Sequence, residues 1–287
     1  MKIIDIHTHG IGGYDTRTAA AEDILKMAEI HGRQGISEIV PTVYPAAIEV
    51  MRGNMAAIRA AMEGQKAVAC RGEDAAIAGI NLEGPFLNPL KCGALDVRAF
   101  LEASEYNLEK LIEGFEDIIR IMTIAPEIEG AEGLIRTITG MGIIVSMGHS
   151  DATYAEAERG FHSGARGITH LFNAMRGIHH REPGIAGFGL LNRDIFIELI
   201  ADPFHLHERT IELVFKVKNP ERIIVVSDSV KQTQTSSKSQ EGITEGNGRL
   251  SGGCMTVIES SRRLTGMGFD TQIVMRCITE NPERYLH

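Results

Sequence analysis

The sequence predicts an α/β chain folded as a closed (β/α)8 barrel, a TIM-type barrel that forms a single catalytic domain over residues 1–287. Eight short apolar runs, rich in isoleucine and valine, recur along the chain. Stretches rich in alanine and glutamate, with helical character, separate these runs. Strands that alternate with helices are typical of parallel α/β folds, and eight such units are the number that closes a barrel. A chain of 287 residues is long enough for one such barrel.

The predicted strands follow one another at regular intervals, and each is short, apolar and β-branched. They are Ile3–His7, Ile36–Val43, Ile77–Glu83, Ile118–Ile124, Ile143–His149, Gly167–Phe172, Ile195–Ile200 and Arg222–Asp228. Helices are predicted in the intervening segments, where apolar and polar residues alternate with helical spacing. The clearest of these are Ala19–Arg33, Ile48–Met62, Leu108–Phe115 and Ala152–Phe161.

The end of the chain is less regular. Residues Lys231–Gly252 are rich in Ser, Thr, Gln and Gly and predict a long flexible loop. Two helices are expected after it, over Met255–Leu264 and Thr271–Thr279, and Asn281-Pro282 predicts a turn.

An open, doubly wound sheet is the alternative fold. That fold usually carries a phosphate-binding loop after its first strand. The glycine-rich turn of this chain, Gly10-Ile-Gly12-Gly13, follows two histidines and is a poor match to such a loop. The barrel is therefore preferred.

Composition excludes several classes of partner. The chain is 43% hydrophobic and 23% charged, which allows a sizeable core, and its net charge is −9. An acidic chain without a long basic run is not expected to bind nucleic acid or an anionic membrane. No apolar run approaches the length of a membrane span, and His7 and His9 stand where a signal peptide needs an apolar core.

The four cysteines point to a reducing compartment. Cys70, Cys92, Cys254 and Cys277 form no C-x-x-C pair, so neither a disulfide framework nor a cysteine zinc site is expected. These features together predict a cytoplasmic protein.

The first predicted strand ends in the sequence His7-Thr-His9. Alternate residues of a strand share a face, so both imidazoles point the same way, with Asp5 one layer deeper. Two adjacent imidazoles can chelate one metal ion, although a strand with two satisfied polar residues would look the same. A metal site at this strand end would require further ligands nearby.

Other metal-binding residue types follow later strands. In a barrel, the carboxyl ends of the strands meet at one face, where the active site lies. The candidate ligands at these ends are His7, His9, Glu83, His149, His170 and Asp228. Their number suggests two ions that share Glu83, with Zn²⁺ preferred and Fe²⁺, Mn²⁺ or Co²⁺ as alternatives. Asp228 is placed to accept and return a proton, which predicts metal-assisted hydrolysis of a polarised carbonyl or phosphoryl centre.

These residues carry a family resemblance. The His-x-His pair, the later histidines and Asp228 resemble the amidohydrolase superfamily, and several motifs resemble its N-acetylglucosamine-6-phosphate deacetylases. The motifs that match are Asn81-Leu-Glu83-Gly-Pro-Phe-Leu-Asn88, Gly148-His149-Ser150-Asp-Ala-Thr153, Thr169-His170-Leu-Phe-Asn173-Ala174-Met175, His179-His180-Arg181-Glu182-Pro183-Gly184, and Leu250-Ser251-Gly252 with Met255-Thr256.

The resemblance implies roles for individual residues. Glu83, His149 and His170 would be metal ligands, His7 and His9 would serve a second ion, and Asp228 would be the catalytic acid and base. The implied substrate contacts are Asn173 and Ala174 with the sugar phosphate, Arg181 with the phosphate, His205 as an orienting histidine, and the loop residues Leu250, Ser251 and Gly252. A planar guanidinium is independently well suited to a phosphate dianion.

The chain also departs from the family pattern. Leu95 stands in Gly93-Ala94-Leu95, where relatives usually have a histidine that contacts substrate. Asp202-Pro203-Phe204 and Ser227-Asp228-Ser229 differ from the usual Asp-Gly and Thr-Asp-Ala. The small β-sandwich that the family normally builds from both chain ends is expected to be absent.

The resemblance implies a metal-dependent deacetylase that converts N-acetylglucosamine-6-phosphate to glucosamine-6-phosphate and acetate. It also implies a homodimer. Two alternatives stay open. Leu95 motivates hydrolysis of another acylated amine or a cyclic amide. The altered loops and the absent sandwich motivate a non-catalytic barrel that binds a sugar phosphate.

Overall fold

A computed structural model of the chain describes residues 1–67, 74–235, 242–244 and 248–287. Its main sheet is the predicted barrel of parallel strands, which neighbour one another in chain order. The eight strands are β1 (Ile4–Thr8), β4 (Glu38–Val43), β6 (Ile80–Leu82), β7 (Ile119–Ile124), β8 (Ile144–Met147), β9 (Gly167–Ile168), β10 (Phe196–Ile200) and β11 (Ile223–Val226). A short strand, β5 (Ala76–Ile77), also pairs with β4.

The barrel is joined between its last and first strands. The backbone N–H of Asp228 donates to the carbonyl of His7 (2.9 Å), and that of His9 donates to the carbonyl of Ser229 (2.8 Å). Thr8 and Ser229 form a parallel bridge. The alternative of an open, doubly wound sheet is therefore wrong, and the ends of β1 and β11 are held side by side.

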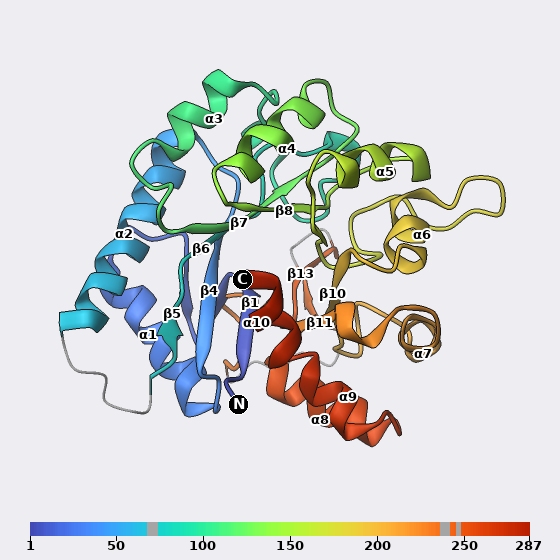
Figure 1. The fold of residues 1–287 in the computed structure, drawn as a ribbon. Helices are drawn as coiled ribbons and strands as arrows, with labels where there is room; N and C mark the ends of the chain where they lie inside the picture. Colours follow the sequence, from blue (N-terminus) through green and yellow to red (C-terminus); the bar gives the residue numbers. More distant parts are fainter. Residues whose placement is uncertain (68–73, 236–241, 245–247) are drawn as a thin grey trace.

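A helix follows each of the eight strands, and the helices surround the strands in chain order (Figure 1). They are α1 (Ala21–Arg33), α2 (Ile48–Ala67), α3 (Glu105–Ile112), α4 (Ala131–Gly140), α5 (Tyr154–His162), α6 (Gly184–Leu191), α7 (Glu208–Val217) and α8 (Val257–Gly266). Capping boxes begin two of them: Thr153 with Glu156 at α5, and Thr256 with Glu259 at α8. These caps fix the loops that leave β8 and β11 at the carboxyl face of the barrel.

The last two helices, α9 (Thr271–Arg276) and α10 (Glu280–Leu286), close the opposite end. The Asn281 amide donates to the carbonyls of Pro220 and Ile223, each at 2.8 Å, and Tyr285 packs into the barrel interior. The turn predicted at Asn281-Pro282 is therefore wrong. Proline is tolerated in the first turn of α10 because its missing N–H would have no intrahelical acceptor there.

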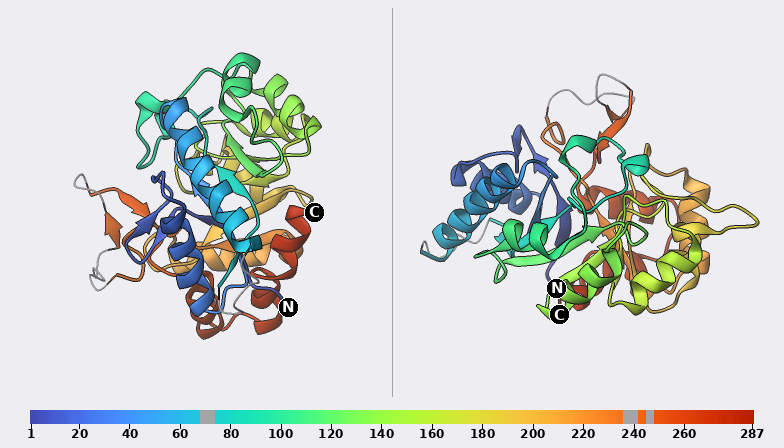
Figure 2. Two further views of the ribbon diagram at one scale, coloured as in Figure 1. Left: turned by 90° about the vertical axis from the view of Figure 1, so that its left-hand side faces the viewer. Right: turned by 90° about the horizontal axis from the view of Figure 1, so that it is seen from above.

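The predicted loop Lys231–Gly252 contains a short hairpin, β12 (Ile243–Thr244) with β13 (Leu250–Gly252). A second hairpin pairs β2 (Gly10–Ile11) with β3 (Tyr14–Asp15). Both views of Figure 2 show the β12–β13 hairpin at the end of the molecule opposite the two termini. The flexibility predicted over residues 236–241 and 245–247, and the expectation for Cys70, lie outside the described residues.

The hydrophobic core has two parts. One lies between strands and helices, and the other fills the barrel. The buried residues inside the barrel are Ile4, Ile6, Val40, Ile121, Ile144, Phe196, Ile200, Ile224, Val226 and Tyr285. In the described part of the chain, no helix has both the length and the apolar character needed to cross a membrane.

Truncation inside the barrel is expected to destabilise the fold strongly. Ile121 is fully buried in this interior cluster. We expect Ile121→Ala to lower the free energy of unfolding by about 2–5 kcal/mol, and Ile121→Val by about 0.5–1.5 kcal/mol. Urea unfolding would measure both. Val50→Ala, at an exposed helical position, is the control and should cost less than about 0.5 kcal/mol. Equal costs at the two positions would contradict the assigned interior.

Candidate metal centre

Six buried side chains meet at the carboxyl ends of the barrel strands. They form two groups, and within each group the potential ligand atoms lie within 4.8 Å of one another. One group is His7, His9 and Asp228, and the other is Glu83, His149 and His170. These are the six residues predicted from the sequence, and they come from the ends of β1, β6, β8, β9 and β11.

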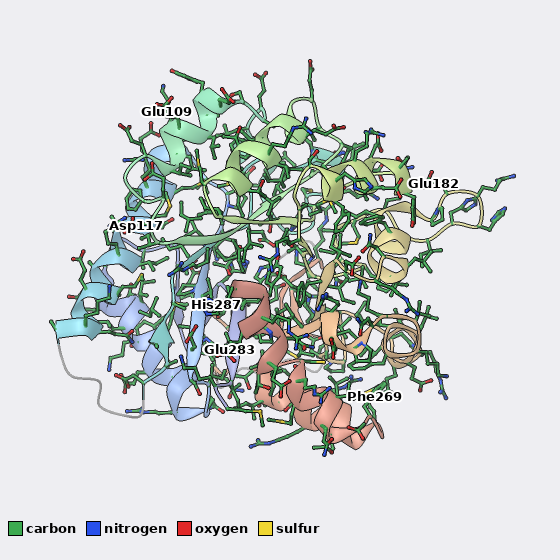
Figure 3. The ribbon with its side chains drawn as sticks, viewed as in Figure 1. Glu109, Asp117, Glu182, Phe269, Glu283 and His287 are labelled. Atoms are coloured by element: carbon green, nitrogen blue, oxygen red, sulfur yellow. The ribbon has the colours of Figure 1, made fainter. Side chains whose placement is uncertain are left out.

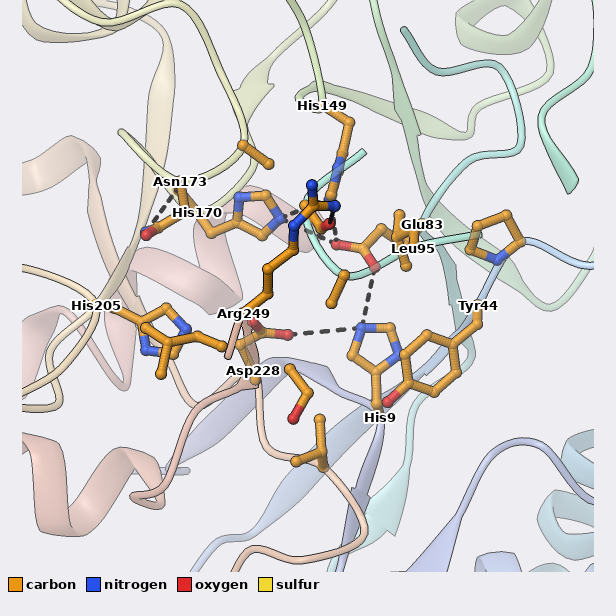
Figure 4. Close-up of a pocket in the computed structure, with 18 of the residues that line it drawn as sticks. His9, Tyr44, Glu83, Leu95, His149, His170, Asn173, His205, Asp228 and Arg249 are labelled. Carbon is orange, nitrogen blue, oxygen red and sulfur yellow. Dashed lines mark hydrogen bonds and ion pairs between the residues drawn. The ribbon is translucent and has the colours of Figure 1, made fainter. Parts of the chain in front are cut away.

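Glu83 lies between the two groups (Figure 4). Its Oε1 is 3.1 Å from Nε2 of His149 and 3.0 Å from Nε2 of His170. Its Oε2 is 3.2 Å from Nε2 of His9. Oε1 also lies 3.5 Å from Nε2 of His7. The Glu83 carboxylate therefore contacts both groups, as a ligand shared between them would.

The second group has similar spacings. Nε2 of His7 and Nε2 of His9 are 3.4 Å apart, and Oδ1 of Asp228 lies 3.4 and 3.5 Å from them. Two ligand atoms that each lie about 2.1 Å from a tetrahedral ion are separated by about 3.4 Å. The observed separations therefore fit a divalent cation in each group, and the mixed nitrogen and oxygen donors suit zinc and its neighbours in the first transition row.

The histidine rings are held so that Nε2 points at the centre. A metal-binding histidine usually donates its other ring N–H to an oxygen, which fixes the tautomer. Three of the four rings have such a partner: His7 with Oε2 of Glu198 (2.8 Å), His9 with the carbonyl of Thr42 (3.0 Å) and His149 with the carbonyl of Lys91 (2.9 Å). Glu198 was not predicted from the sequence, although a carboxylate within the apolar run Ile195–Ile200 was a signal for it.

Strained backbone conformations gather at the same place. His149, His170 and Asp228 have φ values of 46°, 28° and 46°, and Ala174 has 48°. Positive φ is uncommon in residues other than glycine and costs about 1–3 kcal/mol at each position. Such strain persists where the surrounding structure over-determines it, and its concentration here supports a functional role for these strand ends.

The electrostatics favour an ionised ligand carboxylate. Burial disfavours charge on Glu83, but the charges of His149 and His9 and the hydrogen bonds from His149 and His170 outweigh it and hold the pKa of Glu83 well below its usual range. Burial also disfavours the imidazolium of His7, but Glu198 outweighs it and, with Glu83 and Asp228, raises the pKa of His7 well above its usual value. The centre is thus a dense set of opposite charges buried from water.

A cavity of about 700 Å³ opens above these residues. Six of the seven predicted substrate-binding residues line it: Asn173, Ala174, His205, Leu250, Ser251 and Gly252. Figure 4 shows Asn173 and His205 on the side of the cavity away from Tyr44. The structure therefore brings together residues from segments more than seventy positions apart.

Arg181 is the exception. It is exposed and is not among the residues that line the cavity. Its neighbour in sequence, Glu182, lies toward the edge of the molecule in Figure 3, on the loop before α6. Arg181 therefore does not line the cavity of its own chain, and its contact with a phosphate stays a prediction.

Tyr44 and Arg17 are among the lining residues that were not predicted. The Tyr44 ring stacks on His9, with ring centroids 3.8 Å apart and planes inclined by 19°. The guanidinium of Arg17 covers Tyr44, with its carbon 4.3 Å from the ring centroid. No sequence signal marked Tyr44, because only the fold places the end of β4 beside the end of β1.

His205 is paired with Asp202 at the cavity wall, Nδ1 to Oδ2 at 2.9 Å. Burial disfavours the charged form of each partner. For Asp202, the hydrogen bond and charge of His205 outweigh burial and hold the pKa well below its usual range. For His205, Asp202 outweighs burial, and Asp228 adds to the effect, so the pKa is raised.

The Asp202–His205 pair predicts a pH-dependent contribution to stability. The His205 part is present below its unfolded pKa and is lost as pH rises through the raised folded pKa. The Asp202 part is present above its unfolded pKa and is lost as pH falls through the lowered folded pKa. We expect Asp202→Asn to cost about 1–3 kcal/mol near pH 5 and less near pH 9, by urea unfolding. In a His205→Asn background the cost should no longer depend on pH, and a pH-independent cost in the parent chain would contradict the pairing.

Comparison with known proteins gives sequence relatives and structural neighbours but no matching protein-family model. An N-acetylgalactosamine-6-phosphate deacetylase of Escherichia coli is 34% identical over 228 residues, which are 79% of this chain and 59% of the relative. An N-acetylglucosamine-6-phosphate deacetylase of Vibrio furnissii is 33% identical over 232 residues, 80% of this chain and 56% of the relative.

A solved structure extends the similarity to the whole barrel. The N-acetylglucosamine-6-phosphate deacetylase of Thermotoga maritima superimposes with a TM-score of 0.87 at 28% identity, over 99% of this chain and 77% of that chain. The chain thus spans less than three fifths of the length of the two curated relatives and about three quarters of the solved chain.

Proposed function

We propose that this chain, whose curated homologues and structural neighbours are N-acetylglucosamine-6-phosphate deacetylases, is a metal-dependent amidohydrolase that releases acetate from N-acetylglucosamine-6-phosphate. One observation carries the proposal. Glu83 lies between two groups of imidazoles, with Asp228 beside one of them, on the floor of a cavity large enough for a sugar phosphate. A barrel that only bound sugar phosphate would have no need of this buried set of ligands.

The proposed ligands are His7, His9, Glu83, His149, His170 and Asp228, and the proposed number of ions is two per chain. Zinc suits the donor set best, and iron, manganese or cobalt would also fit. When bound, such ions polarise a carbonyl group and lower the pKa of water to about 7.

The chain's own residues then handle the proton. The Asp228 carboxylate accepts a proton from the attacking water, whose oxygen forms the new bond to the acetyl carbon. Asp228 returns that proton to the sugar nitrogen as the carbon–nitrogen bond breaks, so acetate and the free amine leave. His205, whose Nδ1 is held by Oδ2 of Asp202 at 2.9 Å, would donate a hydrogen bond to the substrate. Asn173, Ala174, Leu250, Ser251 and Gly252 would shape the sugar site.

The test is acetate release from a panel of substrates by the metal-replete protein. N-acetylglucosamine-6-phosphate should give the highest kcat/KM, ahead of N-acetylglucosamine and of cyclic amides. A preference for a cyclic amide or another acylated amine would replace the substrate assignment. Substoichiometric metal together with no turnover after added Zn²⁺ would favour a non-catalytic binding barrel.

A second substrate belongs in the panel because of one observation. The relative from Escherichia coli is an N-acetylgalactosamine-6-phosphate deacetylase. The two sugars differ only in the configuration at C4. Comparable kcat/KM values for both would place this chain's specificity in the phosphate and the acetamido group rather than in the C4 hydroxyl.

The remaining proposals concern the assembly and its location. We propose a homodimer in which the exposed loop bearing Arg181 reaches the phosphate bound by the partner subunit. We also propose a cytoplasmic location, which the free thiols of Cys92, Cys254 and Cys277 support, and one barrel domain over residues 1–287. Sedimentation analysis of the chain and of Arg181→Met would test the dimer.

A further inference from the structure

The wall of the cavity at residues 93–96 departs from the family pattern at Leu95. Gly93, Ala94, Leu95 and Asp96 all line the cavity. An aliphatic side chain cannot donate a hydrogen bond to an anion, and the carboxylate of Asp96 is already paired with Arg98, Nη2 to Oδ2 at 2.6 Å. A phosphorylated substrate therefore needs a cation from another segment at this wall.

Arg249 approaches this same wall from the β12–β13 hairpin. Its Nη1 donates to the carbonyl of Gly93 at 3.0 Å and lies 3.7 Å from Sγ of Cys92. Figure 4 shows its side chain reaching across the cavity, from the side of Asp228 toward His149. The bond to Gly93 places a guanidinium beside the loop that carries Leu95.

The charges of the cavity lining make Arg249 the natural anion ligand. Among the described lining residues, Arg17 and Arg249 are the two with permanent positive charge. The Arg17 guanidinium bonds both oxygens of Asp15, with Nη2 to Oδ2 at 2.8 Å, and covers Tyr44. The Arg17 guanidinium is thus held over Tyr44 by its own loop, and the Arg249 guanidinium is held against the carbonyl of Gly93.

The geometry of the substrate also matches this position. A pyranose ring carries the 2-acetamido and 6-phosphate groups on opposite sides. An anion ligand must therefore lie at the rim while the acetyl group lies over the metal ligands. Arg249 is exposed at that rim, and Glu83 and Asp228 are buried below it.

We propose that Arg249 binds the phosphate of the substrate from within the same chain and makes the enzyme selective for phosphorylated sugars. This inference rests on the proposed deacetylase function and gives it a specificity residue. A guanidinium has five N–H donors in a planar fork, so it can bond two phosphate oxygens in addition to the carbonyl that orients it. The phosphate site then includes Arg249 from the same chain that supplies Asp228. This holds whether or not Arg181 of the partner subunit adds a second contact.

The test compares kcat/KM for N-acetylglucosamine-6-phosphate and for N-acetylglucosamine. Arg249→Met should lower the ratio of these two values by about thirtyfold, mainly through KM, as expected for one lost hydrogen-bonded charge. Arg249→Lys should retain part of the preference. Arg17→Met is the matched control, because it also removes a rim arginine, and it should change the ratio by less than about threefold.

Two outcomes would overturn the inference: an unchanged ratio, or equal losses on both substrates, which would mean that Arg249 only supports the Gly93 loop. Arg249→Gln guards against misfolding, since its amide can still donate to Gly93. Leu95→His should restore part of the preference in the Arg249→Met background.

If the parent chain hydrolyses neither sugar, the proposed function fails, and calorimetric titration with inorganic phosphate still decides the inference. Equal affinity of the parent and Arg249→Met for phosphate would then refute it.

Discussion

Asp228→Asn is expected to lower kcat by about a thousandfold or more while the protein keeps its fold and its metal. The asparagine oxygen can still face Nε2 of His7 and His9, as Oδ1 of Asp228 does at 3.4 and 3.5 Å. It cannot accept a proton at neutral pH, so the transfer from water to the leaving nitrogen is lost. Asparagine also tolerates the positive φ of 46° at this position better than most residues.

The measurement is steady-state acetate release together with metal content by elemental analysis. Asp96→Asn is the control, because Asp96 lines the same cavity but is exposed and paired with Arg98, Nη2 to Oδ2 at 2.6 Å. That variant should keep kcat within a few fold of the parent chain. Turnover at the parent rate in Asp228→Asn would remove Asp228 from the mechanism.

Glu83→Gln is expected to abolish high-affinity metal binding in both groups. The neutral amide has one oxygen instead of two. It therefore cannot present an oxygen to His149 and His170 and another oxygen to His9, as the Glu83 carboxylate does. Substitution of a residue that only supports a ligand weakens metal affinity by about 10–100-fold. Loss of the shared ligand itself should cost at least about a hundredfold in affinity, and activity should fall with it.

Metal affinity can be followed by competition with a coloured chelator, and occupancy by elemental analysis. Glu38→Gln is the matched control, since Glu38 begins β4 at the opposite end of the barrel and pairs with Lys2 at 3.3 Å. It should bind metal like the parent chain. A Glu83→Gln variant that retains two ions with unchanged affinity would refute the shared ligand.

Much of the fold and of the centre could be predicted because both depend on local pattern. All eight barrel strands overlap the apolar runs identified in the sequence, and the six candidate ligands lie at or near the ends of those runs. Strand ends of a barrel share one face, so a list of polar residues at strand ends is already a list of neighbours. The prediction from sequence was wrong where the local composition and the tertiary packing favour different structures. Asn281-Pro282 has the composition of a turn but begins α10, because the helix packs its Tyr285 into the barrel.

The supporting residues could not be predicted. Glu198 and Tyr44 act on His7 and His9 from other strands, at separations of 191 and 35 positions along the chain. Their contacts depend on ring orientation and on the join between β1 and β11, which leave no periodic trace in the sequence. Arg181 shows the converse, since a motif identified the residue but not its place, which is outside the cavity of its own chain.

The sequence by itself thus determined which residues are candidate metal ligands and which strands carry them, because strand periodicity and residue type fix both. Only the tertiary structure decided that Glu83 stands between the two groups, that each of three imidazoles is held by an oxygen, and that Arg249 rather than Arg181 enters the cavity. These are distances between segments remote in the chain. They are set by the packing of side chains around the whole barrel, and no single segment contains that information.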